Sequence, residues 1–121
     1  MQLWTVNLKK ADWQTAPEAA DVCAALRAGE LVAVPTETVY GLAADATNGR
    51  ACARIFEAKG RPQFNPLISH VPSLDDARLH GHFDSLALQL ANAFWHGPLT
   101  LVVPKKATSP ISDMSTAGLE T

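Results

Sequence analysis

The sequence predicts an α/β fold, either a sandwich or an open twisted sheet, because strand-like and helix-like segments alternate along it. Two short apolar runs rich in β-branched residues, 31–34 and 99–103, each stop at a proline, which is typical of buried strands. Helical periodicity fills residues 48–58 and 84–94. The 121 residues are enough for one small domain with a core and too few for two.

The N-terminal part is expected to hold a strand and a helix ahead of the first buried run. Residues 3–8 alternate loosely between apolar and polar side chains, which indicates a strand. Helical spacing predicts a helix over 16–28, with Thr15 as its cap and Pro17 in its first turn. Gly29 has the position that commonly ends a helix.

Hydroxyl side chains follow the first buried run. Thr36 comes just after it, where it can cap a following helix and aim hydroxyls and backbone N–H groups at one point. Ligands favour the carboxyl ends of strands in α/β sheets, so this stretch is a candidate binding loop. The helix over 48–58 is the clearest in the sequence, with Asn48 as its cap and Gly60 as the residue that ends it.

The second half continues the alternation. Residues 66–71 and 99–103 are expected to be strands, separated by two helices. The first of these helices is short and capped by Ser73, and the second spans 84–94. Residues 105–116 are polar and contain Pro, Ser and Asp, so they are expected to form a loop.

Composition and charge argue against some classes of protein. Apolar residues make up 47% and charged residues 18% of the chain, which is typical of a globular protein. A net charge of −2 argues against nucleic-acid binding through bulk electrostatics, although it leaves a local basic patch open. Cys23 and Cys52 lie far apart, outside any C-x-x-C pair, and are predicted to be reduced core thiols. No signal-peptide pattern or membrane-length apolar run is visible, so a cytoplasmic location is the default expectation.

A candidate anion site lies at the start of residues 59–71. Lys59 and Arg61 are two positions apart, and Arg61 precedes Pro62, which disfavours a helical backbone. In an extended segment such side chains point the same way, so both cations can converge on one anion. The sequence contains no Walker or Rossmann glycine loop and no dense cluster of metal-ligating residues.

Each candidate residue also has a purely structural alternative. Lys59 near a helix C-terminus is stabilised by the helix dipole. Asn65 before a proline is a common turn residue, and His70 at a strand end can be an ordinary surface residue. Thr36 and Thr38 can simply be caps. The residues alone therefore predict a small α/β domain with a candidate anion pocket, and no more.

Longer motifs extend this interpretation. They are Pro35-Thr36-Glu37-Thr38-Val39-Tyr40-Gly41-Leu42, then Lys59-Gly60-Arg61-Pro62, Asn65-Pro66-Leu67-Ile68 and His70-Val71, and later Trp95, Gly97, Pro98, Leu99 and Thr100. Together they resemble the YrdC-like family, the threonylcarbamoyl-AMP synthases, over a match that runs from about Ala16 to the end. The resemblance implies a twisted open mixed sheet with flanking helices around a positively lined cavity.

The resemblance also implies an enzyme. L-threonine and bicarbonate would form a carbamate that attacks the α-phosphate of ATP, giving threonylcarbamoyl-AMP and pyrophosphate, with Mg²⁺ carried by the phosphates. The product would serve threonylcarbamoyl modification of the tRNA adenosine next to the anticodon, with tRNA-modification proteins and tRNA as candidate partners. Lys59 and Arg61 would be catalytic and would bind ATP together with Asn65. The threonine-binding residues would be Thr36, Thr38 and His70, with Tyr40 shaping the pocket.

Two departures from the family pattern matter. His96 stands where the family usually has Pro, and the chain stops at Thr121, where family members continue with segments that complete both pockets. We therefore expect residues 1–121 to form the N-terminal two-thirds of a single YrdC-like domain, incomplete at the C-terminus and inactive or crippled alone. Two alternatives stay open: an RNA-binding module for tRNA or rRNA, and a YciO-like paralogue of uncertain role.

Overall fold

The computed structural model describes residues 1–7, 9–60, 62 and 65–121. In chain order its elements are a 3₁₀ helix η1 (Trp13–Thr15), α1 (Pro17–Arg27), β1 (Val32–Val34), β2 (Gly41–Ala43), α2 (Gly49–Lys59), α3 (Leu74–His80) and α4 (Ser85–Phe94). Strands β1 and β2 pair antiparallel, with Val32 opposite Ala43. The predicted α/β class is confirmed, and the sheet in the described part consists of these two strands.

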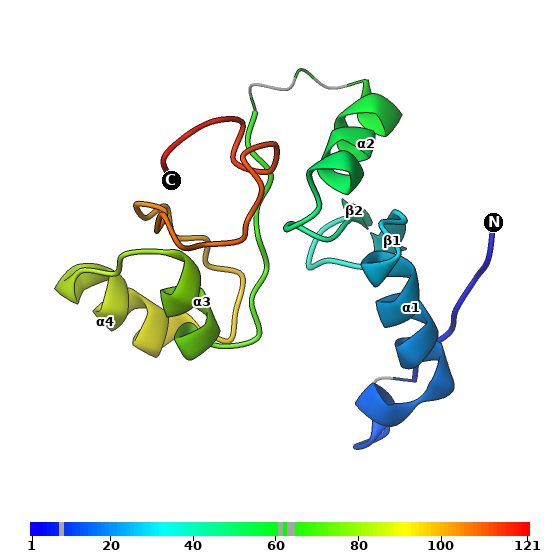
Figure 1. Cartoon of the computed structure of the whole chain (residues 1–121). Helices are drawn as coiled ribbons and strands as arrows, with labels where there is room; N and C mark the ends of the chain where they lie inside the picture. The colour runs from blue at the N-terminus through cyan, green and yellow to red at the C-terminus, as the bar shows by residue number, and fades with distance from the viewer. Residues whose placement is uncertain (8, 61, 63–64) are drawn as a thin grey trace.

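Two groups of elements make up the molecule (Figure 1). One group contains α1, β1, β2 and α2, and the other contains α3, α4 and the C-terminal segment. A C-terminal turn, residues 109–118, connects them through backbone hydrogen bonds. The N–H of Ser112 donates to the carbonyl of Ala46 at 2.9 Å, and the N–H of Leu67 donates to the carbonyl of Ser115 at 2.8 Å.

Helix α2 carries much of the core and is held at both ends. The side-chain oxygen of Asn48 accepts hydrogen bonds from the N–H groups of Arg50 and Ala51, both at 3.1 Å. Gly60 ends the helix in the left-handed region, with φ of 56°. Both predictions are confirmed. The buried side chains of α2 are Ala51, Cys52, Ile55 and Phe56.

Helix α1 is present as predicted, but its details differ. Its N-cap is Ala16, which makes no side-chain capping bond, whereas the Thr15 hydroxyl donates to the carbonyl of Asp12. The predicted Thr15 cap is therefore wrong, because Thr15 belongs to the preceding turn of η1. Cys52 is buried as expected, but Cys23 is exposed on a side of α1 that no described element covers.

The two short helices of the second group begin where the sequence predicts. The Ser73 side chain accepts from the N–H of Asp76 at 3.1 Å, and the Asp84 side chain accepts from the N–H of Ala87 at 2.8 Å. The expected loop 105–116 contains no helix or strand, apart from one isolated bridge at its first residue. Among the described residues, no helix combines the length and the apolar character needed to cross a membrane.

Three predicted strands are wrong. Residues 3–7, 66–71 and 99–103 are not strands, and residue 8 lies outside the described residues. The stretch before α3 does run as an extended trace (Figure 1). Apolar, β-branched runs favour an extended backbone, but a strand also needs a partner to complete its ladder of hydrogen bonds. In the described part of the chain these runs find no such partner.

Candidate functional site

The turn between β1 and β2, residues 35–40, carries the hydroxyl side chains singled out in the sequence. The Thr36 oxygen accepts from the N–H groups of Thr38 at 3.3 Å and Val39 at 3.2 Å. Its hydroxyl also contacts the Val39 carbonyl. Thr36 thus satisfies backbone N–H groups as a cap would, but no helix follows. The predicted helix cap is wrong, because the chain turns back to form β2 against β1.

This turn presents its side chains to solvent. The hydroxyl oxygens of Thr36 and Thr38 lie 3.5 Å apart, and both residues are exposed. Val39 and Tyr40 are 73% and 76% exposed, which is high for side chains of their size. The turn therefore places two hydroxyls side by side, that of Thr36 already bonded within the turn, and leaves apolar area uncovered at one end of the two-stranded sheet.

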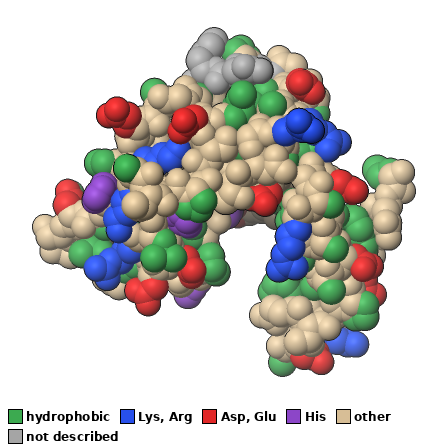
Figure 2. Space-filling model, in the orientation of Figure 1, with side chains coloured by type: hydrophobic (Ala, Val, Ile, Leu, Met, Phe, Trp, Pro, Cys, Tyr) green, Lys and Arg blue, Asp and Glu red, His purple; other side chains and the backbone are tan. Residues whose placement is uncertain are grey.

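A groove of about 780 Å³ lies beside this turn. Its walls come from residues 66–74 and 95–103, and Glu37 contributes from the turn between β1 and β2. Figure 2 shows that the molecule is hollowed between its two groups of elements. On this face Lys and Arg side chains are interspersed with Asp and Glu side chains and do not gather into one basic patch (Figure 2).

His70 lies in this groove with a defined ring orientation. Its Nδ1 is 3.2 Å from the carbonyl oxygen of Ile68. Because a carbonyl can only accept, Nδ1 carries the proton in this contact, and Nε2 of the neutral ring is an acceptor. The exposed imidazole is therefore prepared to accept a hydrogen bond from a hydroxyl or ammonium group.

Of the three residues predicted to bind ATP, the structure describes Lys59 and Asn65. Lys59 is the last residue of α2 and is exposed, as is Asn65. Neither is among the described residues that line the groove. Arg61 lies outside the described residues, so the convergence of Lys59 and Arg61 on one anion stays a prediction. The structure brings His70 and the Thr36–Thr38 turn to one groove through Glu37, and it leaves Lys59 outside it.

Sequence reasoning overlooked the contacts of the opposite wall. The indole nitrogen of Trp95 donates to the Leu99 carbonyl at 2.8 Å, and its ring meets Phe83 edge-on at 6.2 Å between centroids. His96 Nε2 lies 3.1 Å from the carbonyl oxygen of Pro72. The sequence offered only an aromatic residue beside a Gly-Pro turn as a signal.

Among the described residues, two ionisable groups have a pKa shifted from its ordinary value. Burial, followed by the nearby charge of Asp45, raises the pKa of the Cys52 thiol. At the surface, a hydrogen bond from Lys105 at 2.8 Å lowers the pKa of the Asp113 carboxyl. Across the described ranges, no three His, Cys, Asp or Glu side chains gather in a way that could hold a metal ion.

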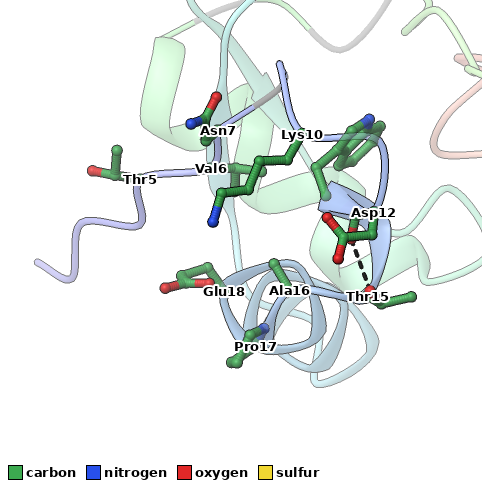
Figure 3. Close-up of a pocket in the computed structure, with 10 residues that line it drawn as sticks. Thr5, Val6, Asn7, Lys10, Asp12, Thr15, Ala16, Pro17 and Glu18 are labelled. Carbon is green, nitrogen blue, oxygen red and sulfur yellow. Dashed lines mark hydrogen bonds between the residues drawn. The ribbon is translucent and has the colours of Figure 1, made fainter.

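A separate, smaller hollow of about 440 Å³ lies near the N-terminus (Figure 3). Residues 5–7 and the start of α1 form its sides, and its polar side chains include Lys10, Asp12 and Glu18. None of the predicted site residues that the structure describes lines it. It is therefore distinct from the groove that contains His70.

The fold and groove define a small α/β chain in which a threonine-bearing turn adjoins a histidine-lined groove. The model of a protein family named Sua5_yciO_yrdC and described as "Telomere recombination" matches residues 24–121. The chain belongs to this family, which confirms the resemblance found in the sequence.

Several curated relatives carry the name threonylcarbamoyl-AMP synthase, among them proteins from Bacillus subtilis and Pyrococcus abyssi. The Bacillus subtilis protein is 44% identical over 119 residues, covering 98% of this chain and 34% of the relative. The Pyrococcus abyssi protein is 52% identical over 97 residues, covering 79% of this chain and 28% of the relative. The chain therefore spans about a third of the length of these relatives.

Solved structures agree with these matches. The structure of a doubly substituted Sua5 from P. abyssi has a TM-score of 0.80 at 45% identity, covering 85% of this chain and 31% of that one. A crystal structure of P. abyssi Sua5 complexed with L-threonine has a TM-score of 0.79 at 45% identity, covering 85% of this chain and 30% of that one.

Proposed function

We propose that this chain is part of a threonylcarbamoyl-AMP synthase, which joins L-threonine, bicarbonate and ATP into threonylcarbamoyl-AMP and releases pyrophosphate and one water. The product then serves threonylcarbamoyl modification of tRNA adenosine next to the anticodon, with tRNA-modification proteins as partners. The observation that carries the proposal is 44% identity over 98% of the chain to a protein with this name. The threonine complex of P. abyssi Sua5 adds support for an amino-acid substrate.

The described residues suit a threonine pocket. Threonine offers an ammonium and a hydroxyl as donors and a carboxylate as an acceptor. In the proposal His70 Nε2 accepts from one of these donors, and the Thr38 hydroxyl can donate or accept as needed. The Thr36 hydroxyl is already bonded within its own turn, so Thr36 serves the pocket by shaping that turn. A site that hydrogen-bonds the substrate hydroxyl rejects valine far better than an apolar pocket does.

The nucleotide side of the proposal uses Lys59, Arg61 and Asn65. Attack of the carbamate on the α-phosphate concentrates negative charge, so catalysis depends mainly on positioning and on nearby cations. Lys59 is exposed at the end of α2, and its long side chain is free to reach a phosphate. In this proposal Mg²⁺ enters on the ATP phosphates, where it usually keeps several of its waters.

We further propose that residues 1–121 form the N-terminal two-thirds of one YrdC-like domain and are inactive or crippled alone. Support comes from the apolar runs 66–71 and 99–103, which have strand-like sequences but no strand partner in the described part. Ile68 and Val102 in these runs are 63% and 80% exposed. Such backbone and apolar area are normally covered in a complete sheet.

The proposal is tested with the full-length gene product. Incubated with L-threonine, bicarbonate and ATP, it should form threonylcarbamoyl-AMP and an equal amount of pyrophosphate, both quantified by chromatography. Lys59→Ala should lower the rate by about 100-fold, since it removes a cation that stabilises transition-state charge. The matched control is Arg50→Ala, at the other end of α2 and also exposed, which should keep the normal rate.

Two results would count against this proposal. One is no product from the full-length protein while tRNA or rRNA still binds, which would favour the RNA-binding alternative. The other is a normal rate of product formation by the 121-residue chain alone, which would overturn the claim that it is inactive.

A further inference from the structure

We infer that His96 is a positioning residue for His70, acting through a hydrogen bond from its imidazole to the Pro72 carbonyl. Nε2 of His96 lies 3.1 Å from that oxygen, and the bond joins residues 24 positions apart in the chain. Because the carbonyl can only accept, His96 donates through Nε2–H. Pro72 lies two residues after His70, so the bond fixes the backbone beside the proposed threonine ligand.

The bond matters because, among the described residues of this chain, the stretch from Leu67 to Pro72 has few other anchors. At its start, the N–H of Leu67 donates to the carbonyl of Ser115, a residue that is only 2% exposed. At its end, Ser73 caps α3. His70 lies between these points, and its own ring bonds back to Ile68 within the same stretch. His96 is therefore the side chain that ties the C-terminal end of this stretch to the opposite wall of the groove.

The wall that carries His96 is itself held by two contacts of Trp95. The Trp95 indole closes the following turn by donating to the Leu99 carbonyl at 2.8 Å. The Trp95 ring also packs edge-on against Phe83, with an angle of 77° between the ring planes. A donor on a fixed turn gives up little conformational freedom when it binds, so its hydrogen bond can hold a less supported partner in place.

The inference rests on the proposed function, because it gives His96 a role in threonine binding. Without the His96 bond, Pro72 and His70 gain freedom, and His70 Nε2 is no longer held toward the groove. Threonine affinity should fall, whereas ATP affinity should not change, because the proposed ATP residues lie before this stretch. His96 need not touch the substrate for this to happen.

Calorimetry on the full-length gene product tests the inference. His96→Leu removes the donor and should weaken threonine binding about threefold to tenfold, the effect of one lost hydrogen bond, with ATP binding unchanged. His96→Gln keeps a side-chain N–H that can reach the Pro72 carbonyl and should recover most of the affinity. His82→Ala is the matched control: His82 is exposed, its side chain makes no hydrogen bond among those described, and binding should stay normal.

A second measurement separates this inference from the proposed function. Nitrogen-15 NMR of the histidine rings should show His70 with its proton on Nδ1 in the unsubstituted protein, and a mixture of tautomers in His96→Leu. Equal threonine affinity for His96→Leu and the unsubstituted protein would overturn the inference, as would failure of His96→Gln to recover it. If the full-length protein binds no threonine, the proposed function falls, and unchanged His70 NMR signals in His96→Leu would then overturn the inference independently.

Discussion

Helix α2 and the stretch 66–71 lie almost next to each other in the sequence, yet they are stabilised in opposite ways. The helix satisfies its own backbone, is capped by Asn48 and Gly60, and buries four side chains. The stretch has a strand-like sequence, but among the described residues only its Leu67 makes a backbone hydrogen bond to another segment. A helix is complete within its own residues, whereas a strand is complete only when a neighbour pairs with it.

The candidate site residues lie on both kinds of segment. Lys59 is placed by the well-formed end of α2, whereas His70 lies in a stretch held by a few contacts with distant residues. A site residue in a stretch like the one that contains His70 depends on contacts with residues far away in the chain. This is why His96, which contacts Pro72, matters for His70 although it is not near it in sequence.

The largest expected effect is the loss of a core side chain of α2. Phe56 is 2% exposed, so Phe56→Ala should lower the free energy of unfolding of this chain by about 3–5 kcal/mol, measured by urea unfolding. Ile68 in the stretch 66–71 is 63% exposed, and Ile68→Ala should change the free energy of unfolding by no more than about 0.5 kcal/mol. Equal losses from the two substitutions would show that the contrast between these segments is wrong.

A smaller effect is expected at the cap of α2. Asn48→Ala removes the oxygen that accepts from Arg50 and Ala51, and should lower the free energy of unfolding by about 1 kcal/mol. Asn48→Asp keeps an accepting oxygen and adds a negative charge that suits a helix N-terminus, so it should retain the stability. Identical urea midpoints for the unsubstituted chain, Asn48→Ala and Asn48→Asp would show that the cap adds little stability.

The smallest expected effect is the contribution of the Cys52 thiol to the pH dependence of the free energy of unfolding. Burial raises the pKa of Cys52 above its ordinary value of 9.0, so the folded state holds this proton more strongly than the unfolded state does. The resulting stability is present below pH 9.0 and is lost as the pH rises from there toward the folded-state pKa. Unfolding followed from pH 8 to 10.5 should therefore show a decline that is shallower in Cys52→Ala.

Cys23 provides the control for this measurement, because its thiol is exposed. Cys23→Ala should leave the pH dependence unchanged, and a thiol reagent should label Cys23 at once but Cys52 only on unfolding. Rapid labelling of both cysteines in the folded chain would contradict the burial of Cys52.

The sequence predicted the helices better than the strands, in line with the contrast between α2 and the stretch 66–71. Helices α2, α3 and α4 were predicted, the first two with their caps Asn48 and Ser73, because capping and periodicity are local signals. The strands 66–71 and 99–103 were not realised, because pairing depends on segments that a local pattern does not contain. The stretch at Thr36 was predicted to be a candidate binding loop that begins a helix, but it forms a turn, since a capping threonine and a turn threonine make the same short-range bonds.

For the candidate site, motifs pointed to Thr36, Thr38 and His70. His70 lines the groove, and the turn that carries the two threonines reaches it through Glu37, whereas Thr36 and Thr38 are not among its described lining residues. The donor from His96 to Pro72 could not be foreseen, because it depends on how the turn after α4 folds back on a stretch far away in sequence. The roles of Lys59, Arg61 and Asn65 remain predictions that only binding measurements can test.

Calorimetric titration of ATP and L-threonine into the full-length gene product, beside the 121-residue chain, tests the central claim most directly. We predict that the full-length protein binds both ligands and discriminates threonine from valine, and that the chain alone binds them weakly or not at all. Absence of threonine and ATP binding by the full-length protein would contradict the account.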